Sequence, residues 1–411
     1  MGVTKIEKKK APTLRFPEFT EDWEQRKLSE LASFSKGNGY TKNDLVESGE
    51  PIILYGRLYI KYETVIQDVD TFVIKKEKSI ISEGNEVIVP ASGESSEDIS
   101  RASVVGRPGL ILGGDLNVIK PVNYIDSIFL ALTISNGAQQ KEMSKRAQGK
   151  SVVHLHNSDL KQVNLLYPLL EEQQKIGSFF KQLDNTIALH QRKLDLLKEQ
   201  KKGYLQKMFP KNGAKVPELR FAGFADDWEE RKLRDLLNKN SEKNKNLSVI
   251  NVESVSNKTG FTKQTEQFED YSVASADLSN YYVIREKQFA YNPSRINVGS
   301  IAYKDLGDEI SVVSPLYVSF STKKVLNDGF LWNWFKTASF DAQRQRLSEG
   351  GVRDTLSFNQ LSEMNTMFTT YPEQETIGSF FKQLDETIAL HQRKLDLLKE
   401  QKKGFLQKMF V

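Results

Sequence analysis

The 411-residue sequence repeats itself at a period of about 200 residues. Segments Ile176–Phe209 and Ile377–Phe410 are 34 residues long and differ at only two places, Asn185/Glu386 and Tyr204/Phe405. This period is far too long for a solenoid repeat and matches the size of a duplicated domain. The sequence therefore predicts two copies of one structural unit.

The two copies also share their openings, LRFPEFTEDWEQRKL from Leu14 and LRFAGFADDWEERKL from Leu219, but diverge between these ends. Residues 34–148 and 238–349 are similar in length and show no alignment. A Gly, Leu, Leu pattern then recurs at an offset of 201 residues, as Gly149, Leu155 and Leu160 and as Gly350, Leu356 and Leu361. A duplication without functional meaning is the simpler alternative. We favour the interpretation that the constant segments bind one shared partner, whereas the two variable segments bind different partners.

These patterns divide the chain into six parts. We predict a basic tail at 1–13, a first variable domain at 14–170, a spacer helix at 171–210, a linker at 211–218, a second variable domain at 219–370 and a second spacer helix at 371–411.

Each repeated segment predicts one long helix of about 38 residues. Glu171 and Glu172 supply the acidic first turn, and no proline follows until Pro210. Apolar residues recur at steps of four and three, which is the heptad pattern of a coiled coil. The seam residues are Ile176, Phe180, Leu183, Ile187, Leu194 and Leu197 in the first copy, and Ile377, Phe381, Leu384, Ile388, Leu395 and Leu398 in the second.

The two helices are expected to pack antiparallel, which relates the halves by a pseudo-two-fold axis and separates two globular domains. His190 and His391 then lie near leucines of the seam and have a structural role. Phe179, Leu189 and Leu196 add apolar surface outside the seam. This surface implies a further partner; a coil that only forms homodimers is the alternative.

The variable domains are predicted to be mixed α/β. Short alternating apolar runs at 71–74, 86–90, 110–112 and 312–320 indicate strands. Helical stretches are expected at 126–132, 139–146 and 329–338.

Basic residues beside aromatic and amide side chains in turn-rich stretches are candidates for DNA contacts. Arginine binds guanine, asparagine binds adenine, and lysine binds phosphate. Isolated basic turns are more often solvated loops, so the clusters near Gly149 and Gly350 carry more weight. The candidates are Lys36, Tyr40, Tyr55, Arg57, Tyr59, Lys145, Arg146 and Lys150 in the first domain, and Tyr291, Asn292, Arg295, Arg344, Arg346 and Arg353 in the second.

Composition and motifs argue against several classes of protein. The chain has no cysteine, no apolar run long enough for a membrane span, and no apolar start suited to secretion, so we expect a cytoplasmic protein. Gly149-Lys150-Ser151 lacks the first glycine of a phosphate-binding loop, and Tyr291-Asn-Pro-Ser294 lacks the second proline and the aromatic residue of an amino-methyltransferase motif. His154 and His156 are expected to alternate on one strand and have no set of partner ligands nearby. We therefore expect neither a catalytic site nor a metal site.

Two variable domains, each followed by a nearly identical long helix, resemble the specificity subunit of type I DNA restriction-modification systems. The resemblance begins at Leu14 and includes the closing motifs Glu172-Gln173 and Glu373-Gln374. It implies that the variable domains are target recognition domains for double-stranded DNA. The basic tail and Thr376, which replaces the Lys175 of the first copy, depart from the pattern.

The resemblance also implies partners. The helices would dock two copies of a methylation subunit, which binds S-adenosylmethionine, and two restriction subunits that use ATP and Mg²⁺ are an optional addition to the complex. No cofactor is expected in this chain itself. A coiled-coil scaffold with two protein-binding domains is the alternative function, and salt dependence of binding would distinguish the two.

Overall fold

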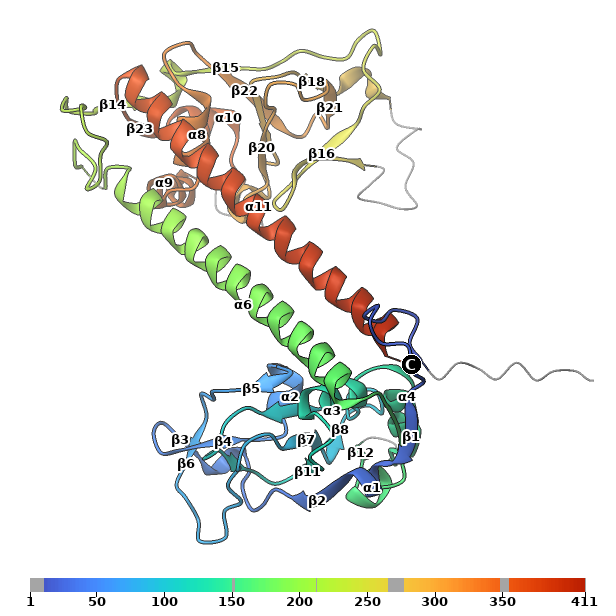
Figure 1. The fold of residues 1–411 in the computed structure, drawn as a ribbon. Coiled ribbons are helices and arrows are strands. Elements are labelled where there is room, and N and C mark those ends of the chain that lie inside the picture. The colour runs from blue at the N-terminus through green and yellow to red at the C-terminus, as the bar shows by residue number, and fades with distance from the viewer. Residues whose placement is uncertain (1–10, 150–151, 212, 265–276, 348–354, 411) are drawn as a thin grey trace, which may run out of the picture. The chain divides into compact units, whose positions relative to one another are not determined.

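The structure is a computed structural model that describes residues 11–149, 152–211, 213–264, 277–347 and 355–410. Its contacts divide the chain into two compact units. The first unit comprises residues 1–192 and 392–411, and the second comprises residues 193–391. Each unit therefore contains one variable domain, the first part of its own long helix and the last part of the other copy's long helix (Figure 1).

The first unit contains a five-stranded sheet and a four-stranded sheet. The larger sheet has the order β2-β11-β7-β9-β5, and the smaller has the order β10-β4-β6-β3. Short ladders join β1 to β13 and β12 to β8. The strands are β1 Glu24–Lys27, β2 Ala32–Lys36, β3 Leu45–Val46, β4 Glu50–Ile53, β5 Val65–Ile66, β6 Phe72–Val73, β7 Val87–Pro90, β8 Ser92–Gly93, β9 Ser103–Val105, β10 Ile111–Leu112, β11 Leu116–Pro121, β12 Val153–His154 and β13 Asn164–Tyr167. The helices are α1 Leu28–Leu31, α2 Arg57–Ile60, α3 Ser127–Ile134, α4 Gly137–Arg146, α5 Asn157–Leu160 and the start of α6 Leu170–Lys207.

The second unit repeats the centre of this arrangement. Its four-stranded sheet, β15-β22-β19-β20, begins with three antiparallel strands that correspond to β2, β11 and β7. The strands are β14 Glu229–Lys232, β15 Leu237–Lys239, β16 Glu253–Ser256, β17 Gly260–Lys263, β18 Tyr282–Ile284, β19 Gln288–Tyr291, β20 Ile301–Tyr303, β21 Ser311–Val313, β22 Val318–Thr322 and β23 Asn365–Phe368. The helices are α8 Asp328–Trp334, α9 Ala338–Leu347, α10 Phe358–Ser362 and the start of α11 Tyr371–Met409. The predicted mixed α/β class is confirmed.

The helices α3 and α8 dock in the same way on the long helices. Asp126 and Asn327 are the N-caps: each side chain accepts a hydrogen bond from the backbone of its helix, at 2.8 and 3.0 Å. The backbone N–H of each cap in turn donates to a glutamine of the long helix at 2.9 Å, Gln173 in one unit and Gln374 in the other. These glutamines belong to the closing motifs, which therefore hold the variable domain on its helix.

A glycine permits this close approach. A Cβ atom built on Gly378 would lie 2.8 Å from the Asn327 side chain and 3.1 Å from the backbone of Gly329. At the matched Gly177, a Cβ atom would lie 2.9 Å from Asp126 Oδ1. A larger residue at either position would force the capping side chain or the start of α3 or α8 to shift.

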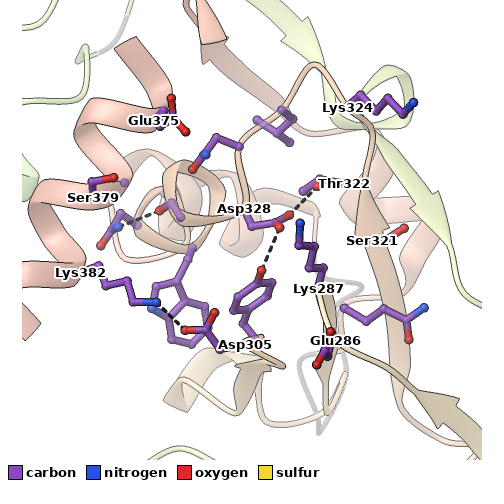
Figure 2. Close-up of a pocket in the computed structure, with 18 of the residues that line it drawn as sticks. Glu286, Lys287, Asp305, Ser321, Thr322, Lys324, Asp328, Glu375, Ser379 and Lys382 are labelled. Atoms are coloured by element: carbon purple, nitrogen blue, oxygen red, sulfur yellow. Dashed lines mark hydrogen bonds and ion pairs between the residues drawn. The ribbon is translucent and has the colours of Figure 1, made fainter. Parts of the chain in front are cut away.

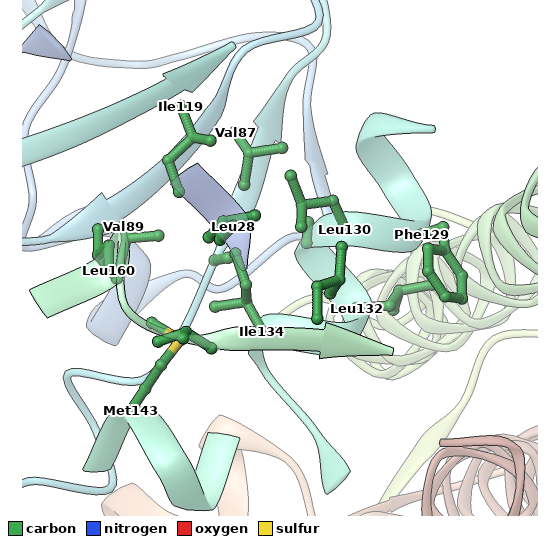
Figure 3. Packing of buried hydrophobic residues seen from close by; sticks show 14 of the residues in the cluster. Leu28, Val87, Val89, Ile119, Phe129, Leu130, Leu132, Ile134, Met143 and Leu160 are labelled. Atoms are coloured by element: carbon green, nitrogen blue, oxygen red, sulfur yellow. The ribbon is translucent and has the colours of Figure 1, made fainter. Parts of the chain in front are cut away.

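The hydrophobic core of each unit lies between its central sheet and its helices. In the first unit, Leu28, Val87, Phe129 and Leu130 are fully buried together (Figure 3). The end of the other copy's helix completes each core: Met409 and Phe410 in the first unit, and Met208 and Phe209 in the second. Phe180 and Phe410 lie 5.9 Å apart between ring centroids, and the equivalent Phe381 and Phe209 lie 6.5 Å apart.

Both predicted long helices are present, with 38 residues in α6 and 39 in α11. Within each unit the two helices run antiparallel, because residues early in one contact residues late in the other. Phe179 packs on Phe405 at 5.1 Å, and Phe380 packs on Tyr204 at 5.1 Å. All of the predicted seam residues are buried or half-buried, so the heptad interpretation is confirmed.

Candidate nucleic-acid interface

In the first unit, a polar edge forms where β7 ends. The strand β8 follows directly and pairs with β12, which comes just after the Gly149 turn. The backbone N–H of Leu155 donates to the carbonyl of Ala91 at 3.0 Å. Tyr59 Oη donates to the carbonyl of Ser92 at 2.8 Å. These bonds bring α2, the loop after β7 and the end of β12 to one place.

The second unit has an equivalent edge where β19 ends. Tyr291 Oη donates to the carbonyl of Leu356 at 3.0 Å, and the backbone N–H of Leu356 donates to the carbonyl of Pro293 at 3.2 Å. Asn292 closes a tight turn, because its side-chain oxygen accepts from the Ser294 backbone at 3.0 Å and its carbonyl accepts from the Arg295 backbone at 3.0 Å. This turn presents the Arg295 side chain to solvent.

The two edges have the same position in the fold and different chemistry. Leu155 and Leu356 occupy matched positions, and each binds the loop after the corresponding strand, β7 or β19. The first loop carries Glu94, Glu97, Asp98 and Arg101, whereas the second carries Arg295. A constant framework therefore holds loops with different hydrogen-bonding groups, which is an arrangement suited to reading different ligands.

Several of the predicted DNA-contact residues are accessible. Lys36, Lys145, Arg295 and Arg346 are exposed. Arg146 is half-buried and donates to Glu142 at 2.9 Å. The positions of Lys150 and Arg353 lie outside the described residues.

Four of the predicted contact residues are buried or already hydrogen-bonded within the fold. Tyr40 is 4% exposed, with its hydroxyl 2.5 Å from Ser79 Oγ, and Tyr291 is fully buried. Arg57 donates to Glu63 at 2.6 Å and to Asp70 at 3.1 Å, and only 8% of its side chain is exposed. Arg344, with 7% exposed, donates to Asp341 at 2.7 Å. Because their polar groups are already used or buried, these side chains offer no surface for a base.

Tyr55 and Tyr59 are half-buried and pack edge to face at 6.3 Å between ring centroids. Burial raises the pKa of the Tyr59 hydroxyl well above its usual range, and nearby Asp98 raises it further. The Tyr59 hydroxyl therefore stays protonated and holds the loop after β7. Asn292 is also half-buried, and its side-chain oxygen holds the turn after β19 by accepting from the Ser294 backbone.

Sequence reasoning missed three polar residues of the first edge. His154 and His156 are exposed and stack at 6.2 Å with their rings 9° apart, and Ser92 Oγ lies 3.3 Å from His154 Nδ1. We predicted that both histidines lie on one strand, but His156 is the N-cap residue of α5. The Ser-Gly-Glu-Ser-Ser run after β7 was the available signal, since it is a turn sequence.

The second unit also has a cavity of about 1010 Å³ between α8, α11 and the central sheet (Figure 2). Asp328 accepts hydrogen bonds from Tyr303 Oη at 2.8 Å and from Thr322 Oγ1, and Lys382 donates to Asp305 at 2.7 Å. Both signs of charge line the cavity and several of them pair with each other. The exposed edge around Arg295 is therefore the better candidate for binding an anionic polymer.

Neither a metal cluster nor a membrane span is found in the part of the chain that the structure describes. Its histidine, aspartate and glutamate side chains form no group of three suited to a metal. Its helices include none that is long and apolar enough to cross a bilayer.

The long helices expose matched leucines outside the seam. In the first unit, Leu189 and Leu397 are 66% and 58% exposed, and in the second unit Leu390 and Leu196 are 59% and 52% exposed. Asp184 faces Lys402 in the first unit, and in this register Leu189 lies level with Leu397. Each unit therefore presents the same pair of apolar side chains from identical segments.

Comparison with protein families gives a match over most of the chain. A family profile described as the type I restriction modification DNA specificity domain matches residues 20–199 and again residues 225–400. The match to two segments agrees with the internal repeat.

Individual relatives are more distant. The chain is 27% identical over 205 residues to a putative type I restriction enzyme MjaX specificity subunit of Methanocaldococcus jannaschii, and this match spans about half of that relative, 47%. It is 20% identical over 413 residues to the type I restriction enzyme MjaVIII specificity subunit of the same organism, covering 96% of this chain and 92% of the relative. A crystal structure of a type I restriction-modification system S subunit from M. genitalium shares the fold, with a TM-score of 0.64 at 14% identity, over 98% of this chain and 99% of that one.

Proposed function

This chain belongs to the type I restriction-modification DNA specificity family, and we propose that it directs methylation to a bipartite, asymmetric DNA sequence. One observation carries the proposal: equivalent edges in the two units hold loops of different chemistry, whereas the long helices are almost identical. Different loops would read two different half-sites. Nearly identical helices would recruit the same partner twice.

Each variable domain would read its half-site in the major groove. Base edges there present distinct patterns of donors and acceptors, and arginine and amide side chains match guanine and adenine. Arg295 and the Asn292 turn would supply such contacts in the second unit. In the first unit, Lys36 and Lys145 would bind phosphates, while the loop after β7 offers acidic groups that accept from cytosine.

The partners would be two copies of a methylation subunit, one for each copy of the repeated helix. The exposed pairs Leu189/Leu397 and Leu390/Leu196 supply the apolar surface for this docking. Surface leucines at matched positions would expose apolar area to water without a partner. S-adenosylmethionine would bind to the methylation subunits, and ATP and Mg²⁺ to restriction subunits where two of these join. This chain would contribute recognition and no catalytic group.

The proposal is tested by mapping N6-methyladenine across the genome of the source cell with and without this gene. We expect one motif of two half-sites separated by a gap to lose its methylation in the deletion. Re-expression of the intact gene should restore the same motif. An unchanged map in cells that express a methylation subunit would contradict the proposal and favour a protein scaffold.

A further inference from the structure

A carboxylate in the first half of each long helix joins three parts of its unit. In the first unit, Asp184 of α6 forms an ion pair with Lys402 of α11 at 2.5 Å and accepts a hydrogen bond from Thr64 Oγ1 at 2.9 Å. Thr64 immediately precedes β5 in the variable domain and is 3% exposed. The carboxylate therefore links its own helix, the other helix and the variable domain.

The second unit builds the same junction from different residues. Asp385 of α11 forms an ion pair with Lys201 of α6, and Lys336 Nζ lies 3.8 Å from Asp385 Oδ2. Lys336 lies between α8 and α9, and its ammonium group sits 4.3 Å above the Trp332 ring centroid. The aspartate and the lysine that faces it from the other helix are the same in both units, whereas the group from the variable domain is a threonine hydroxyl in the first unit and a lysine amino group in the second.

We propose that Asp184 and Asp385 are positioning residues, which fix the register of the long helices and the seating of each variable domain on them. The proposal deepens the proposed function, since register and seating would set the gap between the half-sites.

The apolar seam alone does not determine the register. Apolar residues repeat every seven positions, so a slip by one heptad would leave the apolar seam largely intact. After such a slip, Asp184 would face Leu395 or Met409 in place of Lys402, and Asp385 would face Leu194 or Met208 in place of Lys201. Lys402 and Lys201 are only 19% and 17% exposed, so a slip would also separate each mostly buried ammonium group from its carboxylate.

The register can be measured directly because the chain contains no cysteine. In the full chain, Leu189→Cys with Leu397→Cys reports the native register, and Leu189→Cys with Gly404→Cys reports a slip of one heptad. A Cβ atom on Gly404 meets no other atom within 4 Å. A short bismaleimide reagent should crosslink the first pair efficiently and the second pair poorly.

Neutralising both carboxylates, in Asp184→Asn with Asp385→Asn, should lower the native crosslink severalfold and raise the slipped one. The charge swap, in which both aspartates become lysine and Lys201 and Lys402 become aspartate, should restore the native crosslink. If the asparagine variant keeps the native yield while remaining folded, the register role is wrong. If the swapped chain slips as the asparagine variant does, charge pairing is not the cause.

Seating is tested through the gap. Thr64→Val keeps the shape of the side chain and removes its hydroxyl, and Thr64→Ser retains the hydroxyl. In the assembled methylation complex, Thr64→Val should reduce discrimination between the native gap and a gap one base pair different, without changing half-site preference. Thr64→Ser should keep the wild-type discrimination between the two gaps. A uniform loss of methylation at every gap would show a purely structural role and overturn the proposal.

The two proposals can fail separately. If the wild-type chain directs no gapped methylation, the proposed function fails, and the crosslinking yields still decide the positioning role. If gapped methylation occurs and neither crosslinks nor gap discrimination respond, only the positioning role fails.

Discussion

Arg15 and Arg220 occupy matched positions, and each forms a bidentate ion pair with a glutamate in the first turn of a long helix. Arg15 binds Glu172 through two nitrogens at 2.6 and 2.7 Å, and Arg220 binds Glu373 at 2.7 and 2.7 Å. Both glutamates are 1% exposed. These contacts explain why LRF opens each repeat and why a glutamate belongs to each closing motif.

We expect Arg15→Met to destabilise the first unit by about 3–5 kcal/mol, because it leaves the Glu172 carboxylate buried without its partner. The measurement is the free energy of unfolding in urea. Arg26→Met is the matched control, since Arg26 is half-exposed and pairs with Glu24 at 3.5 Å. The control should cost no more than about 1 kcal/mol. Equal effects of the two variants would contradict this expectation.

Arg295→Ala should weaken binding of the cognate duplex by about 1–3 kcal/mol if the guanidinium reads a base, and should relax specificity at one position. A phosphate contact would instead give a smaller loss that is uniform across sequences. The measurement is a titration of duplexes with single substitutions at fixed salt. Arg346→Ala is a second exposed arginine for comparison. Unchanged binding by the Arg295 variant would remove it from the interface.

Lys336 makes stability depend on pH. Burial and the nearby Lys201 lower the pKa of Lys336 to about 7 from its usual 10.5. Below pH 7 both folded and unfolded states carry the charge, and its desolvation destabilises the folded state. Between pH 7 and 10.5 the folded state releases the proton while the unfolded state keeps it, so stability rises with pH.

Accordingly, Lys336→Met should raise the Tm most below pH 7, and this gain should shrink by pH 9. Because 29% of the side chain is exposed, solvent moderates the effect. Lys324→Met, an exposed lysine in the same unit, provides the control and should show no such trend. A gain that is independent of pH would contradict the assignment.

Among single residues, the sequence pattern indicates basic and aromatic turn stretches, but it does not show which of their side chains are buried. Tyr40 and Arg57 sit in turn sequences typical of binding loops. Their burial depends on Ser79 and on Glu63 and Asp70, and no local rule predicts such packing between loops. The Asp184 junction has no local signal either, because it joins residues far apart in the chain.

At the scale of elements, periodic segments were predictable and short strands only in part. The heptad pattern over four repeats predicted both long helices, since helical periodicity of that length has few alternatives. The runs at 86–90 and 110–112 became β7 and β10, whereas 312–320 was split into β21 and β22 by a turn at Pro315. The correspondence of β2, β11 and β7 with β15, β22 and β19 left no visible sequence alignment, because many apolar combinations fill the same core.

Lengthening either long helix by one heptad should change the gap and leave both half-sites unchanged. Seven residues add about 10 Å of helix, or roughly three base pairs of DNA. The measurement is the methylated motif that the variant directs. A control insertion of the same length in the 211–218 linker should leave the gap unaltered. A changed half-site with an unchanged gap would refute the idea that the helices act as a spacer.

For the whole molecule, the structural units differ from the sequence repeats. The sequence divides near residue 210, whereas the contacts give the first unit residues 392–411 and give the second unit residues 193–207 of α6. The repeat predicted two similar domains and antiparallel helices. It did not predict that Phe410 would close the core around Phe129, because a repeat shows what is duplicated and not which copy supplies each contact.

The first unit takes its last residues from the end of the second long helix, so it is completed only when the final part of the sequence has been translated. Residues up to 192 leave the ribosome about 200 residues before residue 392, which at about 5–20 residues per second is a delay of about 10–40 s. Throughout that time the nascent first domain lacks Met409 and Phe410, so the pocket between Phe129 and Phe180 remains open to chaperones and to neighbouring chains. The second domain already has Met208 and Phe209 when its own strands emerge. The domain translated first is therefore the one that finishes folding last.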